Sequence, residues 1–159
     1  MRKTVSAPLE MAADFVHAAA SGAAAPLPLE LHGSLFRIRC TVCGLRQGDR
    51  SAIDATAIET LPHCDTCGAL MRPDIVWFGE PLDPMVLGEA VGLASAANVC
   101  LVVGTSALVH PAAGLADLTR RAGGAIIEVN VDNTPITGVA AAVLRGPAAK
   151  IVPELLRPH

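Results

Sequence analysis

Tyrosine is absent from this sequence, and aromatic residues make up only 3% of it. A surface that stacks nucleic-acid bases needs several aromatic side chains, so this composition argues against one. The formal net charge of −3 also argues against a dedicated nucleic-acid binder. A zinc-ribbon nucleic-acid binder stays open as an alternative because of a basic cluster, Arg37, Arg39, Arg46 and Arg50. On balance we do not expect nucleic acid as a partner.

Long apolar runs are absent too. No stretch approaches the ~20 apolar residues that cross a membrane, although 52% of the chain is hydrophobic, a value that alanine inflates. The alanine-rich start has no apolar run long enough for export. We therefore expect no membrane partner and a cytoplasmic location, where thiols stay reduced.

Four of the five cysteines form two close pairs in the pattern Cys-x2-Cys-x20-Cys-x2-Cys. Two residues between thiolates let both sulfurs reach one metal at about 2.3 Å, and two such turns complete a tetrahedral zinc site. The predicted ligands are Cys40, Cys43, Cys64 and Cys67. Two disulfides are the alternative, which a reducing compartment disfavours. Zinc held by four protein sulfurs has no open position for water, so we expect it to be structural.

The chain divides by composition around these cysteines. Residues 1–28 are a poorly defined N-terminal segment with a short helix predicted at 11–20, and residues 40–70 form the zinc-binding module. An extended segment at 29–39 leads into the first cysteine pair. Residues 71–159 carry most of the regular structure.

The order of elements after the cysteines indicates an α/β fold. We predict a β-type run at 74–78, buried strands at 99–103 and 125–129, and helices from Pro84, from Pro111 and over 147–156. Strand, helix and strand at this length form a right-handed βαβ unit. The prediction is a partial Rossmann-like parallel sheet, built from 29–39 and 71–159, with a four-cysteine zinc-ribbon module.

Small and polar residues follow both predicted strands. Gly104, Thr105 and Ser106 follow the first, and Asn130-Val131-Asp132 spans the end of the second. Ligands of parallel sheets bind beyond the carboxyl ends of the strands, so a nucleotide ribose or phosphate could approach here. Plain turns are the alternative, and the sequence has no Gly-x-Gly-x-x-Gly motif.

Several ordered motifs together resemble a known family. Glu30-Leu31-His32-Gly33-Ser34-Leu35 precedes the first cysteine pair, and Arg72-Pro73-Asp74-Ile75-Val76-Trp77-Phe78-Gly79-Glu80 follows the second. The two polar strand ends and Gly146-Pro147-Ala148 come next. From about residue 29 to 156 the chain is similar to the C-terminal half of a sirtuin, an NAD-dependent protein-lysine deacylase. It looks most like the bacterial and mitochondrial deacetylase and desuccinylase branch.

The resemblance implies a role for particular residues. His32 matches the catalytic histidine, the general base that activates a ribose hydroxyl after the acyl oxygen has attacked the nicotinamide ribose carbon. The implied NAD+ contacts are Gly104, Thr105, Ser106, Asn130, Val131, Asp132 and Ala148. The implied substrate-binding segment is Val76, Trp77, Phe78 and Gly79, which would pair with a peptide carrying an acylated lysine. A buried loop histidine and a core tryptophan or phenylalanine are the alternatives for His32 and this segment.

The sequence also departs from the family. The strand and Gly-Ala-Gly-x-Ser loop with which a sirtuin opens are not present, nor is the Asp-Phe-Arg element after it. Met11 and Ala12 stand where the family has Gln and Asn, whereas Asp14 and His17 keep the family spacing. We therefore expect an apparently truncated deacylase with structural zinc and NAD+ as co-substrate. A catalytically silent, zinc-containing peptide-binding remnant is the alternative.

Overall fold

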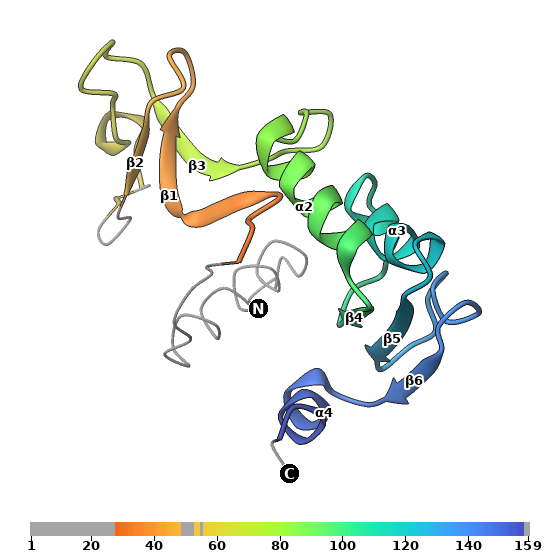
Figure 1. Cartoon of the computed structure of the whole chain (residues 1–159). Helices are drawn as coiled ribbons and strands as arrows, with labels where there is room; N and C mark the ends of the chain where they lie inside the picture. Colours follow the sequence, from red (N-terminus) through yellow and green to blue (C-terminus); the bar gives the residue numbers. More distant parts are fainter. Residues whose placement is uncertain (1–27, 49–52, 55, 158–159) are drawn as a thin grey trace. The chain divides into compact units, whose positions relative to one another are not determined.

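The computed structural model describes residues 28–48, 53–54 and 56–157 (Figure 1). The helix predicted at 11–20 lies outside the described residues, as does almost all of the predicted segment 1–28. The chain forms two compact units, which divide between Asp83 and Pro84. We call residues 1–83 unit 1 and residues 84–159 unit 2.

Unit 1 is built on an antiparallel sheet of three strands in the order β2-β1-β3. The central strand β1 (Gly33–Cys40) pairs with β2 (Arg46–Gly48) and with β3 (Met71–Ile75). A short 3-10 helix, η1 (Ile58–Thr60), lies in the polar region between the cysteine pairs. The buried side chains at the cysteine end of the sheet are Ile38, Cys40, Cys64 and Met71.

The strand after the second cysteine pair differs from the prediction at 74–78. β3 begins at Met71 and ends at Ile75, and the chain then turns, with the Glu80 amide donating to the Trp77 carbonyl at 2.9 Å. Trp77 and Phe78 are 52% and 96% exposed. The alternative that one of them is core is therefore wrong, because a turn does not place alternate side chains against a sheet as a strand would.

The predicted domain boundaries differ from the boundary between the two compact units. The strands β1 and β3, which flank the cysteine module, form one sheet with β2, which lies inside that module. Whether residues 29–39 also serve the nucleotide-binding part stays a prediction.

Unit 2 carries a parallel sheet in the order β4-β5-β6. Its strands are β4 (Val99–Val103), β5 (Ala125–Asn130) and β6 (Ala142–Arg145). The helices are α2 (Pro84–Ala96), the 3-10 turn η2 (Ala112–Gly114), α3 (Leu115–Arg121) and α4 (Ala148–Leu155). The α/β fold class and the parallel β4-α3-β5 unit are confirmed, and the predicted start of α2 at Pro84 is met.

Helices α2 and α3 pack on each other beside the sheet. The buried Thr119 hydroxyl donates to the Ala94 carbonyl at 2.6 Å and ties α3 to α2. The core side chains of this unit include Ala107, Ala116, Ile126 and Ile136, with Cys100 packed against them. Cys100, the fifth cysteine, is therefore a half-buried packing residue of this unit.

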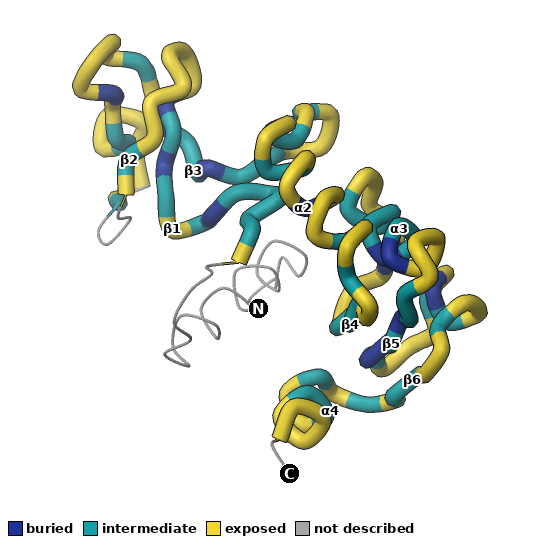
Figure 2. Tube along the Cα trace, viewed as in Figure 1, coloured by how far each residue is buried: buried dark blue, intermediate teal, exposed yellow. Residues whose placement is uncertain are grey.

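The two predicted strands differ in burial (Figure 2). In β5, Ile126, Glu128 and Val129 are at most 2% exposed, as expected for a strand with neighbours on both sides. The expected burial of β4 is wrong, because Val99 is 51% exposed and the rest of the strand is half-buried. β4 is an edge of its sheet among the described residues, so one side of it has no strand to cover it.

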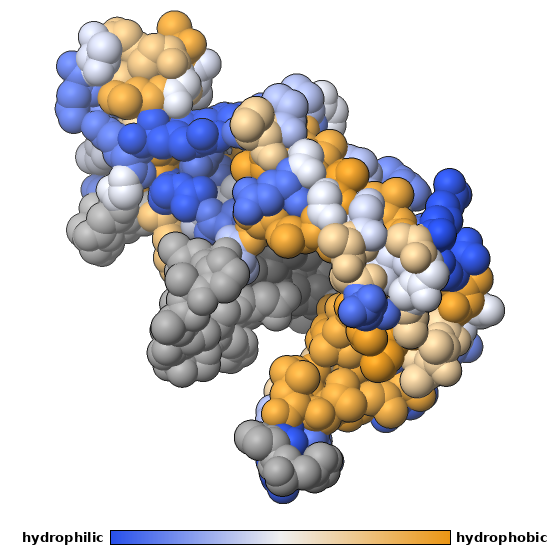
Figure 3. Space-filling model, viewed as in Figure 1, coloured by the Kyte–Doolittle hydropathy of each residue, from blue (hydrophilic) through white to orange (hydrophobic). Residues whose placement is uncertain are grey.

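Apolar surface also gathers on unit 2 (Figure 3). Figure 3 shows it in orange near α4, where Leu155 and Leu156 are 42% and 67% exposed. Across the described residues, no helix has the length and apolar character needed to cross a membrane.

Candidate functional site

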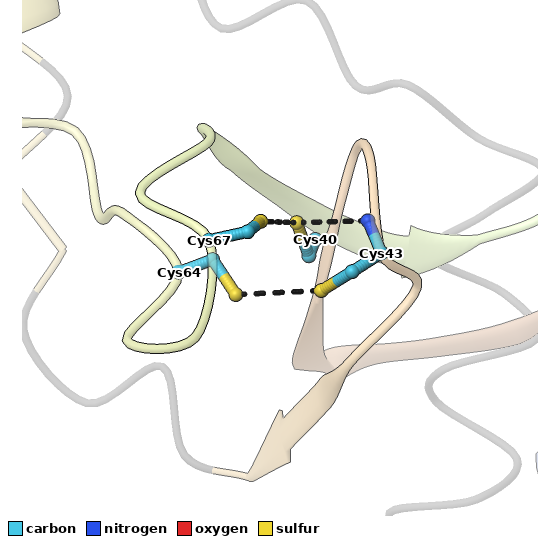
Figure 4. A group of neighbouring side chains, drawn as sticks. All are labelled: Cys40, Cys43, Cys64 and Cys67. Carbon is cyan, nitrogen blue, oxygen red and sulfur yellow. Dashed lines mark hydrogen bonds between the residues drawn. The ribbon is translucent and has the colours of Figure 1, made fainter.

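The four paired cysteines converge at one end of the unit 1 sheet (Figure 4). Their sulfurs all lie within 4.8 Å of one another, with Cys40 to Cys67 at 3.4 Å and Cys43 to Cys64 at 3.5 Å. All four are free thiols, so the disulfide alternative is not what the structure has. Four sulfurs at this spacing surround a position from which each can bind one tetrahedral ion, so the cluster is suited to zinc.

Tight turns bring the sulfurs to this point. Gly44 and Gly68 follow the two pairs with φ of 73° and 72°, a left-handed conformation that side chains with a Cβ seldom adopt. The backbone amides of Val42 and Cys43 both point at the Cys40 sulfur at 3.4 Å. A thiolate accepts these bonds better than a thiol, so the turn is preorganised for a bound cation.

The pKa values of the thiols follow from the same turns. The amides of Cys43 and Val42 lower the pKa of Cys40 to about 6, and amide donors also lower the pKa of Cys64. The Leu45 amide favours a Cys43 thiolate, but hydrogen bonds with Cys40 and Cys64 outweigh it and raise the pKa of Cys43 to about 12. Without a metal the cluster holds part of its protons, and a divalent cation is what would let all four sulfurs ionise.

His32 lies in the turn that leads into β1. The Gly33 amide closes this turn on the Glu30 carbonyl at 3.0 Å, and the His32 carbonyl accepts from the Val76 amide at 2.9 Å. The Nδ1 atom of His32 is buried and has no hydrogen-bond partner among the described residues. Burial lowers the pKa of His32 below its ordinary 6.5. The imidazole is therefore neutral at pH 7 and can accept a proton.

A charged network fixes the segment predicted to bind substrate. Glu80 accepts from both Arg39 at 2.9 Å and Arg72 at 2.6 Å, and from the Trp77 amide at 3.1 Å. The Trp77 amide and then Arg72 lower the pKa of Glu80. The Arg72 guanidinium lies over the Trp77 ring, 4.4 Å from its centre. The contacts of Glu80 and Arg72 thus hold the turn that carries the exposed Phe78.

The described arginines of the basic cluster are not free cations. Arg37 pairs with Glu30 and Asp74, and Arg46 also pairs with Asp74. Arg39 pairs with Glu80, as above, whereas Arg50 lies outside the described residues. This pairing lowers the positive field that a nucleic-acid surface needs.

The two polar strand ends of unit 2 lie side by side. The register pairs Val103 with Val129, so both strands finish at the same edge of the sheet. The Gly104 amide donates to the Val129 carbonyl at 2.9 Å, and the Asn130 side-chain amide donates to the Thr105 carbonyl at 2.7 Å. Residues 104–106 and 131–132 are exposed there. The structure thus brings together two groups of predicted contacts that are far apart in the chain.

The third strand ends at the same edge, although the sequence did not reveal it. β6 stops at Arg145, and the Gly146 amide donates to the Asn130 carbonyl at 3.2 Å. The predicted contact Ala148 is the first residue of α4, two residues after Gly146. Its role stays a prediction, but its position beside the other strand ends follows from the parallel pairing of β5 and β6.

Sequence reasoning missed two residues at this edge. Glu128 is 0% exposed and forms an ion pair with Arg145 at 3.3 Å. The signal was available, because an acidic residue inside the apolar run at 125–129 must find a partner when it is buried. The partner was hidden since it comes from β6, a strand that was not predicted.

Comparison with known proteins agrees with this arrangement. Residues 14–111 match the Sir2 family. The chain belongs to the Sir2 family. It is 46% identical to an NAD-dependent protein deacylase of Thermococcus kodakarensis, covering 81% of this chain and 51% of that protein. It is 49% identical to one from Mycobacterium tuberculosis, covering 79% and 54%. The chain spans about half the length of the curated relatives it matches.

Solved Sir2 structures give the same result for the fold. A Sir2 homologue in complex with NAD matches with a TM-score of 0.76 and 47% identity, over 80% of this chain and 48% of that one. A Sir2 complex with a p53 peptide and NAD+ matches with a TM-score of 0.72 and 34% identity, over 80% and 53%. The predicted family is therefore confirmed, and the fold is that of the matching part of these proteins.

Proposed function

We propose that this chain is the part of an NAD-dependent protein-lysine deacylase that carries the catalytic histidine, the zinc module and one side of the NAD+ site. The reaction would move an acyl group from lysine to ADP-ribose and release nicotinamide. The observation that carries the proposal is the bond from Asn130 to Thr105, which joins two polar strand ends of a parallel sheet in a Sir2-family chain.

In this proposal, His32 is the general base. Its Nδ1 is buried and unpartnered among the described residues, and its lowered pKa keeps the ring neutral. A neutral imidazole can take the proton of a ribose hydroxyl, which is the task the family assigns to this position. The hydrogen bond of its carbonyl to Val76 sets the position of the backbone from which the ring extends.

The remaining site residues divide between nucleotide and peptide. Gly104, Thr105, Ser106, Asn130, Val131, Asp132 and Ala148 would contact NAD+, and Val76, Trp77, Phe78 and Gly79 would contact the acylated peptide. Cys40, Cys43, Cys64 and Cys67 would hold zinc and fix the sheet from which His32 is presented. A zinc with four sulfur ligands supplies folding energy rather than chemistry.

A reducing compartment such as the cytoplasm fits this zinc module. All four thiols would have to stay reduced to bind the ion, and oxidation to disulfides would remove the ligands.

The test is deacylation of an acetylated or succinylated peptide by the purified chain, with and without NAD+. We expect NAD+-dependent formation of the deacylated peptide, lowered by roughly 100-fold or more in His32→Ala. His63→Ala is the matched control, since it removes an exposed histidine of the same unit. Formation of deacylated peptide that His32→Ala leaves unchanged would refute the catalytic role of His32.

The second candidate is a zinc-containing module that binds peptide without turnover. The four-thiol cluster and the exposed side chains of Trp77 and Phe78 support it. Peptide binding by the wild type, without nicotinamide release and without measurable NAD+ binding, would identify that module.

A further inference from the structure

The Glu128 carboxylate is a fully buried charge with a complete set of partners. It accepts from the Thr134 hydroxyl, from the Thr137 hydroxyl at 2.7 Å and from Arg145 at 3.3 Å. Burial by itself would raise the pKa of Glu128, but these donors outweigh it and lower the pKa. The carboxylate is therefore ionised at neutral pH. Burying a charge costs folding free energy, which the partners of the charge must offset.

Arg145 extends from this carboxylate to the loop after β5. Its Nη1 atom donates to the Asp132 carbonyl at 2.8 Å and reaches the Asn130 carbonyl at 3.5 Å. Its Nη2 atom donates to the Asn133 side chain and to the Thr137 hydroxyl. One guanidinium thus binds both ends of the strand tip at 130–132, which is otherwise exposed at Val131 and Asp132.

The same contacts continue to the neighbouring strand. The Asn130 carbonyl accepts hydrogen bonds from the Arg145 guanidinium and the Gly146 amide. The Asn130 side-chain amide donates to the Thr105 carbonyl. The Thr105 hydroxyl in turn accepts from the Ala107 amide at 3.2 Å. Glu128 is therefore linked, through Arg145 and Asn130, to the conformation of both polar strand ends.

We propose that Glu128 and Arg145 are positioning residues, which hold the strand tip at 130–132 in the conformation that recognises a ribose hydroxyl of the dinucleotide. This inference rests on the proposed function. Neither side chain needs to touch the nucleotide. Arg145 is suited to the task because its planar guanidinium donates from two nitrogens in fixed directions, whereas a lysine ammonium donates from a single atom.

The first test needs no nucleotide. Amide hydrogen exchange is measured for the wild type, Arg145→Gln and Arg120→Gln, where the control removes an exposed guanidinium that pairs with Asp117. We expect at least tenfold faster exchange at 104–107 and 131–134 in Arg145→Gln only, with β4, α3 and β5 unchanged. Equal acceleration throughout unit 2 would mean a merely structural role and would overturn the inference.

The second test reads ribose recognition directly. Affinities for NAD+ and for a 2′- or 3′-deoxyribose analogue are measured by calorimetry in the wild type, Arg145→Gln, Arg145→Lys and Glu128→Gln. We expect the wild type to prefer NAD+ by about tenfold, a preference that Arg145→Gln and Glu128→Gln lose and that Arg145→Lys recovers in part. Wild-type preference retained in Arg145→Gln would overturn the positioning role alone. A wild type that binds neither nucleotide would overturn the proposed nucleotide site and the ribose role with it, whatever the exchange result.

Discussion

A Cβ at Gly33 would lie 2.0 Å from the backbone carbonyl oxygen of Asp74, and Gly33 has φ of 76°. β1 and β3 therefore approach each other at the residue that follows His32 closely enough that only glycine fits. The position of the proposed base depends on this approach, because the His32 carbonyl bonds to Val76 just beyond it.

Replacing Gly33 by alanine should accordingly destabilise unit 1. The left-handed backbone and the backbone clash together should lower the free energy of unfolding by about 3 kcal/mol. Urea unfolding of the zinc-loaded protein measures this. Gly48→Ala is the control, because a Cβ there meets no atom of the described residues within 4 Å. If Gly33→Ala lowered stability no more than Gly48→Ala, the close approach would not exist in solution.

Zinc should be required for unit 1 only. Metal analysis should find one zinc per chain, lost in Cys64→Ser and kept in Cys100→Ser, since Cys100 packs in the core of unit 2. A strong chelator should abolish hydrogen-exchange protection in β1 and β3, because the binding energy of a structural zinc is folding energy. Protection of β5, whose sheet has no metal ligand among the described residues, should persist. Loss of protection in β5 together with β1 and β3 would contradict a zinc requirement confined to unit 1.

Stability should fall on the acid side through His32. Its pKa is lowered by burial in the folded chain, whereas an unfolded histidine titrates near 6.5. The unfolded state therefore binds more protons at this residue as the pH drops below about 6.5, so the free energy of unfolding decreases there. Above that pH both states are neutral at this residue and its effect vanishes. His32→Asn should show a shallower loss of stability below pH 6.5, and equal slopes in both proteins would argue against a buried imidazole.

Trp77 offers a direct probe of the predicted peptide segment, because it is the single tryptophan of the chain. Glu80→Ala removes the carboxylate that binds Arg39, Arg72 and the Trp77 amide. We expect greater quenching of Trp77 fluorescence by acrylamide and weaker binding of an acylated peptide. Without Glu80 the Arg72 guanidinium should leave the Trp77 ring, and the lost cation–π contact should destabilise the turn by about 0.5–1 kcal/mol.

Glu59→Ala is the control for this experiment, since Glu59 is an exposed carboxylate of η1 in the same unit. Unchanged quenching in Glu80→Ala would mean that the turn is held by its backbone alone.

Residue patterns predicted the units of secondary structure where the signal was local. The apolar run at 99–103 is β4 residue for residue, and the proline at 84 begins α2. The spacing of Cys40, Cys43, Cys64 and Cys67 predicted a cluster that the structure has. These predictions hold because a strand's apolar run, a helix start and a metal turn are each encoded within a few neighbouring residues.

The failures came from contacts between distant residues. Trp77 and Phe78 continue a β-type pattern, yet the chain turns there, because Arg39 of β1 holds the Glu80 carboxylate that binds the Trp77 amide. β6 was missed because four residues carry too little pattern to separate a strand from a loop, and only pairing with β5 makes them one.

The sequence by itself determined the family, the four sulfur ligands and the alternation of strands and helices, since these are written in motifs and local periodicity. Only the tertiary structure decided that, among the described residues, the buried His32 nitrogen has no partner and β4 lies at an edge. It also decided that Glu128 pairs with Arg145. Each of these depends on the environment that separate segments create together. Burial and pairing set a group's pKa and its partners, and neither can be calculated from the residue's neighbours along the chain.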